Sequence, residues 1–183
     1  MTNILEKIIN DKKESLKLIK KSYSLSSLEN INKDLNFFFN FKEAIQKTED
    51  VALITEIKKA SPSAGVIVKN FNHMNIARMY IANGATCLSV LTEEKHFLGK
   101  LEYIRDIKKK FKIPVLAKDF FIDPYQVSLS KSFGCDCILI IIDAISPSQA
   151  DEIYSEAIKQ NLSVIVEVHD HKEAEKALKY DQA

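Results

Sequence analysis

The sequence predicts an α/β protein of the closed (β/α)8 barrel class, the TIM-barrel type, preceded by an N-terminal helical extension. From residue 51 onward, short apolar runs alternate with segments of helical periodicity, which is typical of right-handed βαβ units and a parallel sheet. Three runs carry ionisable side chains at their carboxyl ends, namely Glu56, Lys118 and Glu167. Barrel enzymes draw their chemistry from the carboxyl ends of many strands, so this pattern favours a barrel.

An open, doubly wound sheet is the competing α/β architecture. Sheets of that kind that bind nucleotides usually carry a glycine-rich turn after the first strand. The chain has four glycines, and none of them forms a Gly-x-Gly motif. The glycines therefore give no support to the open sheet.

The first 49 residues predict a helical extension that covers one end of the barrel. Apolar residues recur at helical spacing from Ile4 to Lys21, and the lysines among them predict a solvated face. The segment 25–48 contains an aromatic cluster that must pack against the rest of the protein, formed by Phe37, Phe38, Phe39 and Phe41. We therefore divide the chain into an extension, 1–49, and a partial barrel, 50–183.

The barrel part contains about five predicted strand–helix units. Strands are expected at 51–57, 87–92, 114–120, 137–142 and 163–168, and helices at 74–83, 100–111, 124–133, 147–160 and from 171 onward. Asp170 is the expected N-cap of the last helix, and Lys108–Lys110 the exposed end of the second. A closed barrel needs eight units and about 250 residues. We therefore expect a chain truncated at its C-terminus, or a partial barrel whose unpaired edges promote aggregation.

The composition argues against several classes of protein. The 26 basic and 25 acidic residues give a net charge of +1, which offers no general attraction to nucleic acid or to an anionic membrane. No apolar run approaches the roughly 20 residues of a membrane span, and the start lacks a signal-peptide core, so a cytoplasmic location is expected. Cys87, Cys135 and Cys137 form no Cys-x-x-Cys pair and are expected to be buried thiols, and no metal site is predicted.

Glu56 and Lys58 are the first candidates for chemistry. On a strand, residues i and i+2 point to the same face, so these two side chains project together where the first strand ends. Taken alone, they are equally compatible with a surface ion pair, which is common and contributes little. Lys118 and Glu167 at the ends of later strands favour an active site.

Four stretches of the chain resemble, in the same order, motifs of the indole-3-glycerol phosphate synthase family. They are Glu56–Ser63, Gly84–Gly99, Pro114–Gln126 and Val166–His169. The helical extension before the first strand is also a trait of that family. Ala64 stands where a lysine is common and Ala117 where an arginine is frequent, and neither position carries an assigned role.

The resemblance implies a lyase of tryptophan biosynthesis that uses no cofactor. The family converts 1-(2-carboxyphenylamino)-1-deoxyribulose 5-phosphate to indole-3-glycerol phosphate, releasing carbon dioxide and water. By this resemblance, Lys118 is the general acid for ring closure, and Lys58 steers the anionic substrate and acts as a second acid. Glu56 and Glu167 share the base and acid duties of dehydration. Lysine and glutamate suit such proton transfers.

Further residues are implied in substrate binding. Ser61 resembles a binding residue beside the first strand. Four others match positions that line the pocket for the anthranilate ring, namely Phe97, Phe120, Leu139 and Ile141. Aromatic and aliphatic walls suit a flat apolar group. Ordinary barrel core is the other interpretation of Leu139 and Ile141.

The family's residues on later strands, including much of its phosphate site, have no counterpart before Ala183. We therefore expect the 183-residue chain alone to turn over poorly, because positioning carries much of catalysis. The small-molecule substrate is the implied partner, and the full-length protein is expected to be a monomer or a fusion with another pathway enzyme. Two other functions remain open: an aldolase that forms a Schiff base at Lys118, and a non-catalytic assembly module.

Overall fold

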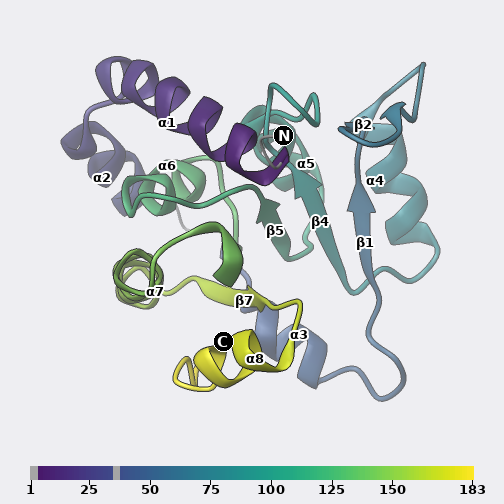
Figure 1. Cartoon of the computed structure of the whole chain (residues 1–183). Helices are drawn as coiled ribbons and strands as arrows, with labels where there is room; N and C mark the ends of the chain where they lie inside the picture. The colour runs from purple at the N-terminus through teal and green to yellow at the C-terminus, as the bar shows by residue number, and fades with distance from the viewer. Residues whose placement is uncertain (1–3, 35–37) are drawn as a thin grey trace.

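The sheet follows the chain from strand to strand without a reversal. A computed structural model describes residues 4–34 and 38–183. Within these residues, the main sheet is built from β1 (Ile54–Ile57), β4 (Cys87–Leu91), β5 (Val115–Lys118), β6 (Cys137–Ile141) and β7 (Ser163–Glu167). All neighbours pair in parallel in the order β1-β4-β5-β6-β7 (Figure 1). A doubly wound sheet would reverse at a switch point, so this order confirms the barrel-type α/β fold.

A helix lies between each strand of the main sheet and the next, and another follows the last strand, as the sequence predicted. These helices are α4 (His73–Ala82), α5 (Leu101–Lys110), α6 (Tyr125–Ser132), α7 (Pro147–Lys159) and α8 (His171–Ala177). A short 3-10 helix (Ile142–Ala144) precedes α7. The side chain of Ser146 caps α7 in a capping box with Gln149. Asp170 accepts a hydrogen bond from the backbone N–H of Glu173, which confirms it as the N-cap of α8.

The first strand is shorter than expected. The N–H of Leu53 donates to Oγ1 of Thr86, and the carbonyl oxygen of Leu53 accepts from the N–H of Thr86. Leu53 is nevertheless not paired as a residue of the parallel sheet. Val51 is 90% exposed. Residues 51–53 therefore lead into the sheet rather than extend β1.

A short antiparallel hairpin after β1 was not predicted. It pairs β2 (Ala60–Ser61) with β3 (Gly65–Val66) around the Ser-Pro-Ser turn. Gly65 has a φ of +65°, a region that glycine enters without steric cost. Strands of two residues carry no periodicity that a sequence can reveal.

The two faces of the sheet pack against different partners. On the outer face, Val90, Val115 and Ile138 lie in the main apolar cluster with residues of the surrounding helices. On the inner face, Leu116 and Cys137 lie in a second cluster with Phe41.

Phe41 begins α3 (Phe41–Gln46), which lies at the end of the sheet where the strands begin (Figure 1). It is 1% exposed, so part of the predicted aromatic cluster fills the inside of the sheet. Phe38 and Phe39 are partly buried, and Phe37 lies outside the described residues.

The extension also contains α1 (Ile4–Ser22) and α2 (Leu25–Asp34), which lie over α6 (Figure 1). The predicted solvated face of α1 is wrong at Lys12, which is buried at 8% exposure. None of the helices described, α1 included, is long and apolar enough to cross a membrane.

Iodoacetamide at pH 8 is expected to leave the cysteines of the folded protein unmodified. Cys87, Cys135 and Cys137 are all completely buried, as predicted. Burial raises the pKa of each thiol, and that of Cys87 reaches about 11, so only about 0.1% of it is thiolate at pH 8. Mass spectrometry after alkylation tests this, with urea-unfolded protein as the reactive control. Labelling of the folded protein at the unfolded rate would contradict it.

Candidate active site

Three of the predicted catalytic side chains project from the inner face of the sheet. Residues along a strand alternate between its two faces. Ile57 and Ala117 belong to the outer cluster, so their neighbours Glu56 and Lys118 lie on the inner face. Glu167 follows the same alternation on β7. Lys118 and Glu167 are the last residues of their strands, so their side chains lie at the carboxyl end of the sheet.

The predicted catalytic residues form two ion pairs. Nζ of Lys58 lies 2.5 Å from Oε1 of Glu56, and Nζ of Lys118 lies 2.8 Å from Oε2 of Glu167. The first pair comes from one strand end, whereas the second reaches from β5 to β7 across β6. All four side chains are between 26% and 35% exposed, and pairs at such exposure stabilise a fold little. They remain open to a substrate.

His169 is a neighbour of this site that the sequence did not identify. Its Nε2 lies 3.4 Å from Oε1 of Glu167. The signal was present in the spacing, because His169 follows Glu167 by two residues at the end of a strand. The sequence placed His169 in the stretch Val166–His169 that resembles the family motif but assigned it no role. The structure thus adds an imidazole to the carboxylate that Lys118 contacts.

Two of the predicted pocket residues meet as an aromatic pair. The ring centroids of Phe97 and Phe120 are 6.1 Å apart, with an angle of 41° between the planes. Phe120 also packs against the inner apolar cluster that contains Leu139 and Ile141. Those two residues are 2% and 7% exposed, so they fit both the interpretation as pocket wall and that as ordinary core.

Ser61 makes contacts only within its own turn among those that the structure describes. Its Oγ lies 3.3 Å from Oγ of Ser63 and accepts a hydrogen bond from the N–H of Ala64. It is partly buried in the β2–β3 hairpin that follows β1. The hydroxyl therefore shapes the loop beside Glu56 and Lys58.

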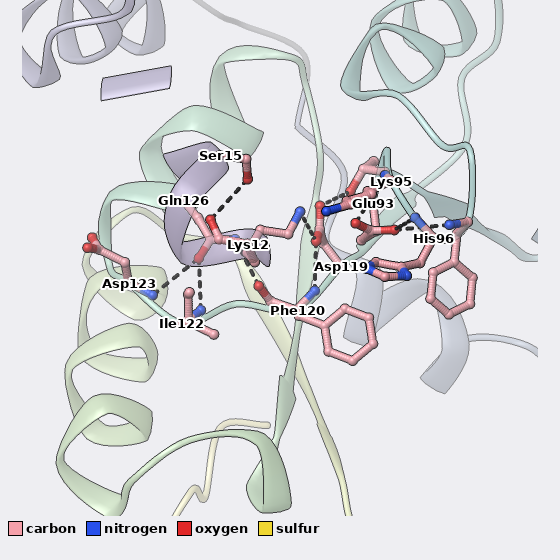
Figure 2. A network of polar contacts seen from close by, with 12 residues as sticks. Lys12, Ser15, Glu93, Lys95, His96, Asp119, Phe120, Ile122, Asp123 and Gln126 are labelled. Carbon is pink, nitrogen blue, oxygen red and sulfur yellow. Dashed lines mark hydrogen bonds and ion pairs between the residues drawn. The ribbon is translucent and has the colours of Figure 1, made fainter. Parts of the chain in front are cut away.

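A buried glutamate organises the loop that carries Phe97. The carboxylate of Glu93 accepts hydrogen bonds from the backbone N–H groups of Lys95, His96 and Phe97, at 3.1, 2.6 and 3.0 Å (Figure 2).

Gly99 closes this loop against the end of β4. A Cβ at Gly99 would lie 2.3 Å from the carbonyl oxygen of Leu91, so no larger residue fits without moving the backbone. The resemblance included Gly99 without showing this close approach.

The arrangement is suited to proton transfer. Ammonium and carboxylate groups face one another at the carboxyl end of a barrel-type sheet, beside an aromatic wall. Within residues 4–34 and 38–183, no group of three or more His, Cys, Asp or Glu side chains is placed to hold a metal ion.

Solved structures resemble the fold. A crystal structure of 3-hexulose-6-phosphate synthase matches with a TM-score of 0.55 and 16% identity, over 72% of this chain and 60% of that chain. A crystal structure of KGPDC from Streptococcus mutans matches with a TM-score of 0.54 and 13% identity, over 73% and 64% of the two chains. At such identities the likeness concerns the fold alone.

Sequence relatives are more specific. A relative from Azospirillum brasilense called indole-3-glycerol phosphate synthase is 42% identical over 97% of this chain and 69% of its own length. One of the same name from Desulforamulus reducens is 36% identical over 97% of this chain and 67% of its own length. The chain thus spans about two thirds of these relatives. They do not favour the aldolase or the assembly module.

The family model described as indole-3-glycerol phosphate synthase matches residues 5–183, which includes every residue of the two ion pairs and the aromatic wall. Family match, relatives and fold agree with the motifs found in the sequence. The chain belongs to the indole-3-glycerol phosphate synthase family.

Proposed function

We propose that Lys118, Glu167, Glu56 and Lys58 perform the acid–base steps of indole-3-glycerol phosphate synthesis. The single observation that carries this proposal is the Lys118–Glu167 pair, which joins an acid and a base 2.8 Å apart at the ends of separate strands. General acids and bases act within such hydrogen-bonding distances of their substrates. The partly exposed pair leaves room for a substrate to replace one partner.

Ring closure is assigned to Lys118. Its ammonium donates a proton to the ketone oxygen while the aromatic ring carbon attacks the carbonyl carbon, so a carbon–carbon bond forms and the ketone becomes a hydroxyl. The carboxylate then leaves as carbon dioxide, and its bonding pair restores the aromatic ring. The rings of Phe97 and Phe120 supply the apolar wall for the anthranilate part.

Dehydration is assigned to the glutamates together with Lys58. Loss of the hydroxyl as water requires one proton delivered to the oxygen and one removed from the new five-membered ring. Glu167 and Glu56 supply this acid and base, and Lys58 holds the anionic substrate beside Glu56. Ser61, in the hairpin after β1, is assigned to substrate binding.

The same proposal covers the binding partner of the protein and its location in the cell. The partner is the small sugar-phosphate and anthranilate substrate, without cofactor, nucleic acid or membrane, and the location is the cytoplasm. The near-neutral net charge of +1 supports a local rather than a general attraction for the anion.

The test supplies 1-(2-carboxyphenylamino)-1-deoxyribulose 5-phosphate to the protein that carries this sequence and follows indole fluorescence. We expect indole-3-glycerol phosphate to form, and borohydride with a keto-sugar phosphate to trap no adduct at Lys118. A borohydride-stable adduct without indole formation would favour the aldolase instead.

A further inference from the structure

Helix α1 reaches the candidate site through a buried ion pair. Nζ of Lys12 lies 2.6 Å from Oδ1 of Asp119, and the two side chains are 10% and 9% exposed (Figure 2). This burial sets the pair apart from the more exposed pairs of the active site. Lys12 belongs to the helical extension, whereas Asp119 lies between Lys118 and Phe120.

The carboxylate of Asp119 gathers three parts of the chain. Besides Lys12, it accepts hydrogen bonds from Oγ1 of Thr92 and from the N–H of Phe120, each at 2.8 Å. Thr92 follows β4 and donates its own N–H to the carbonyl of Lys118 at 3.1 Å. Movement of this carboxylate would therefore move the segment from which Lys118 and Phe120 project.

The preceding residue of α1 holds the other half of the aromatic wall. Asp11 accepts from Nζ of Lys95 at 2.6 Å and contacts Nε2 of His96 at 2.8 Å. His96 directly precedes Phe97. Two consecutive residues of α1 thus bind the neighbours of both rings.

We propose that Lys12 is a positioning residue for the synthase reaction, acting through Asp119 to fix the direction of Lys118 and Phe120. This inference rests on the proposed function. A buried ion pair adds little net stability compared with apolar side chains, but it requires a defined geometry. A displacement of about 1 Å at a reacting group can cost about 100-fold in rate, so such a constraint matters for turnover.

Another ion pair of α1 provides a matched control. Lys20 lies 2.5 Å from Asp123, which also follows β5, but these side chains are 43% and 34% exposed. Loss of Lys20 removes an exposed link between α1 and this segment, whereas loss of Lys12 also leaves the Asp119 carboxylate buried without its cation. If Lys12 positions Lys118, only its loss should reduce turnover.

The kinetic test compares Lys12→Met, Lys12→Arg and Lys20→Met in the protein that carries this sequence. We expect Lys12→Met to lower kcat about 10-fold or more with KM within about 2-fold, Lys12→Arg to recover most of the rate, and Lys20→Met to change little. Equal effects of Lys12→Met and Lys20→Met, or an unchanged kcat in Lys12→Met, would overturn the inference.

Amide hydrogen exchange provides a readout that does not depend on activity. Lys12→Met should speed exchange in the peptide 117–122, whereas Lys20→Met should affect it much less. Absence of synthase activity in the unmodified protein would refute the proposed function, and the exchange rates would still decide whether Lys12 orders this segment. Equal exchange in both variants would overturn the inference.

Thr92→Val covers the case in which Lys12→Met does not fold. It removes one hydroxyl donor from the same carboxylate with little change in shape. We expect a fall in kcat of about 3-fold and faster exchange at 117–122. Unchanged kcat and exchange would count against the positioning role.

Discussion

Lys118→Met is expected to lower kcat of the synthase reaction by about 10²–10⁴-fold, the usual contribution of a general acid. Methionine keeps an unbranched side chain of similar length but cannot donate a proton to the ketone oxygen. Lys118 is the last residue of β5, and its ammonium contacts Glu167 on the inner face of the sheet. The loss therefore falls on the proton needed for ring closure.

The fold should tolerate this change. The Lys118 side chain is 26% exposed, and an ion pair at such exposure contributes at most about 1 kcal/mol. The loss of activity should therefore occur without a large change in the urea midpoint. This combination separates a chemical role from a structural one.

Lys112→Met is the matched control, because Lys112 is an exposed lysine just before the same strand. Its kcat should stay close to that of the unmodified protein. Initial rates of indole fluorescence, measured at saturating substrate, give both values. A Lys118→Met protein whose kcat falls less than about 10-fold would remove Lys118 from the role of general acid.

The number, order and direction of the strands of the main sheet were predictable from sequence because each buried parallel strand is a short apolar run. The ends were less certain. The third predicted strand covered 114–120, whereas β5 ends at Lys118, because Asp119 turns its carboxylate toward Lys12 and Thr92. The end of β5 is set by polar contacts of the residue that follows it, and the apolar pattern of the strand does not reveal such contacts.

The charged members of the site were found because each stands at the end of a strand. The contact of Glu56 with Lys58 also followed from their spacing, whereas the partner of Lys118 did not. That Lys118 contacts Glu167 rather than Glu56 depends on how β5, β6 and β7 lie beside one another. Helical spacing does distinguish Lys12 from the exposed Lys13, since Lys12 lies four residues after Ile8 and four before Leu16 on the apolar face of α1, but the spacing does not show that Asp119 is its partner.

Lys108 shows the same limit at the opposite end of the sheet. The run Lys108–Lys110 predicted an exposed helix end, which is correct for Lys109 and Lys110 but wrong for Lys108. Its side chain is 7% exposed and lies 2.6 Å from Oδ2 of Asp136, which is completely buried. An acidic residue just before β6 gave no local sign of this pairing.

Lys108→Met is expected to destabilise the fold by about 3–5 kcal/mol, because it leaves the Asp136 carboxylate buried without a cation. Burial raises the pKa of Asp136 and lowers the pKa of Lys108, so burial disfavours the charged form of each group. Two neutral donors would remain on Asp136, the N–H groups of Phe39 and Val115, at 2.7 and 2.8 Å.

The same two N–H groups determine how much stability the double variant Lys108→Met/Asp136→Leu is expected to lose. Removing both charges avoids an unpaired buried ion and often costs little. At this site, however, it leaves the N–H groups of Phe39 and Val115 without their acceptor, so a loss of about 1–3 kcal/mol should remain. Urea unfolding of both variants, with Lys109→Met as the exposed control, measures these differences. If Lys108→Met is no less stable than Lys109→Met, the Asp136 carboxylate tolerates burial without its cation. The N–H groups of Phe39 and Val115 would then be sufficient to stabilise that carboxylate.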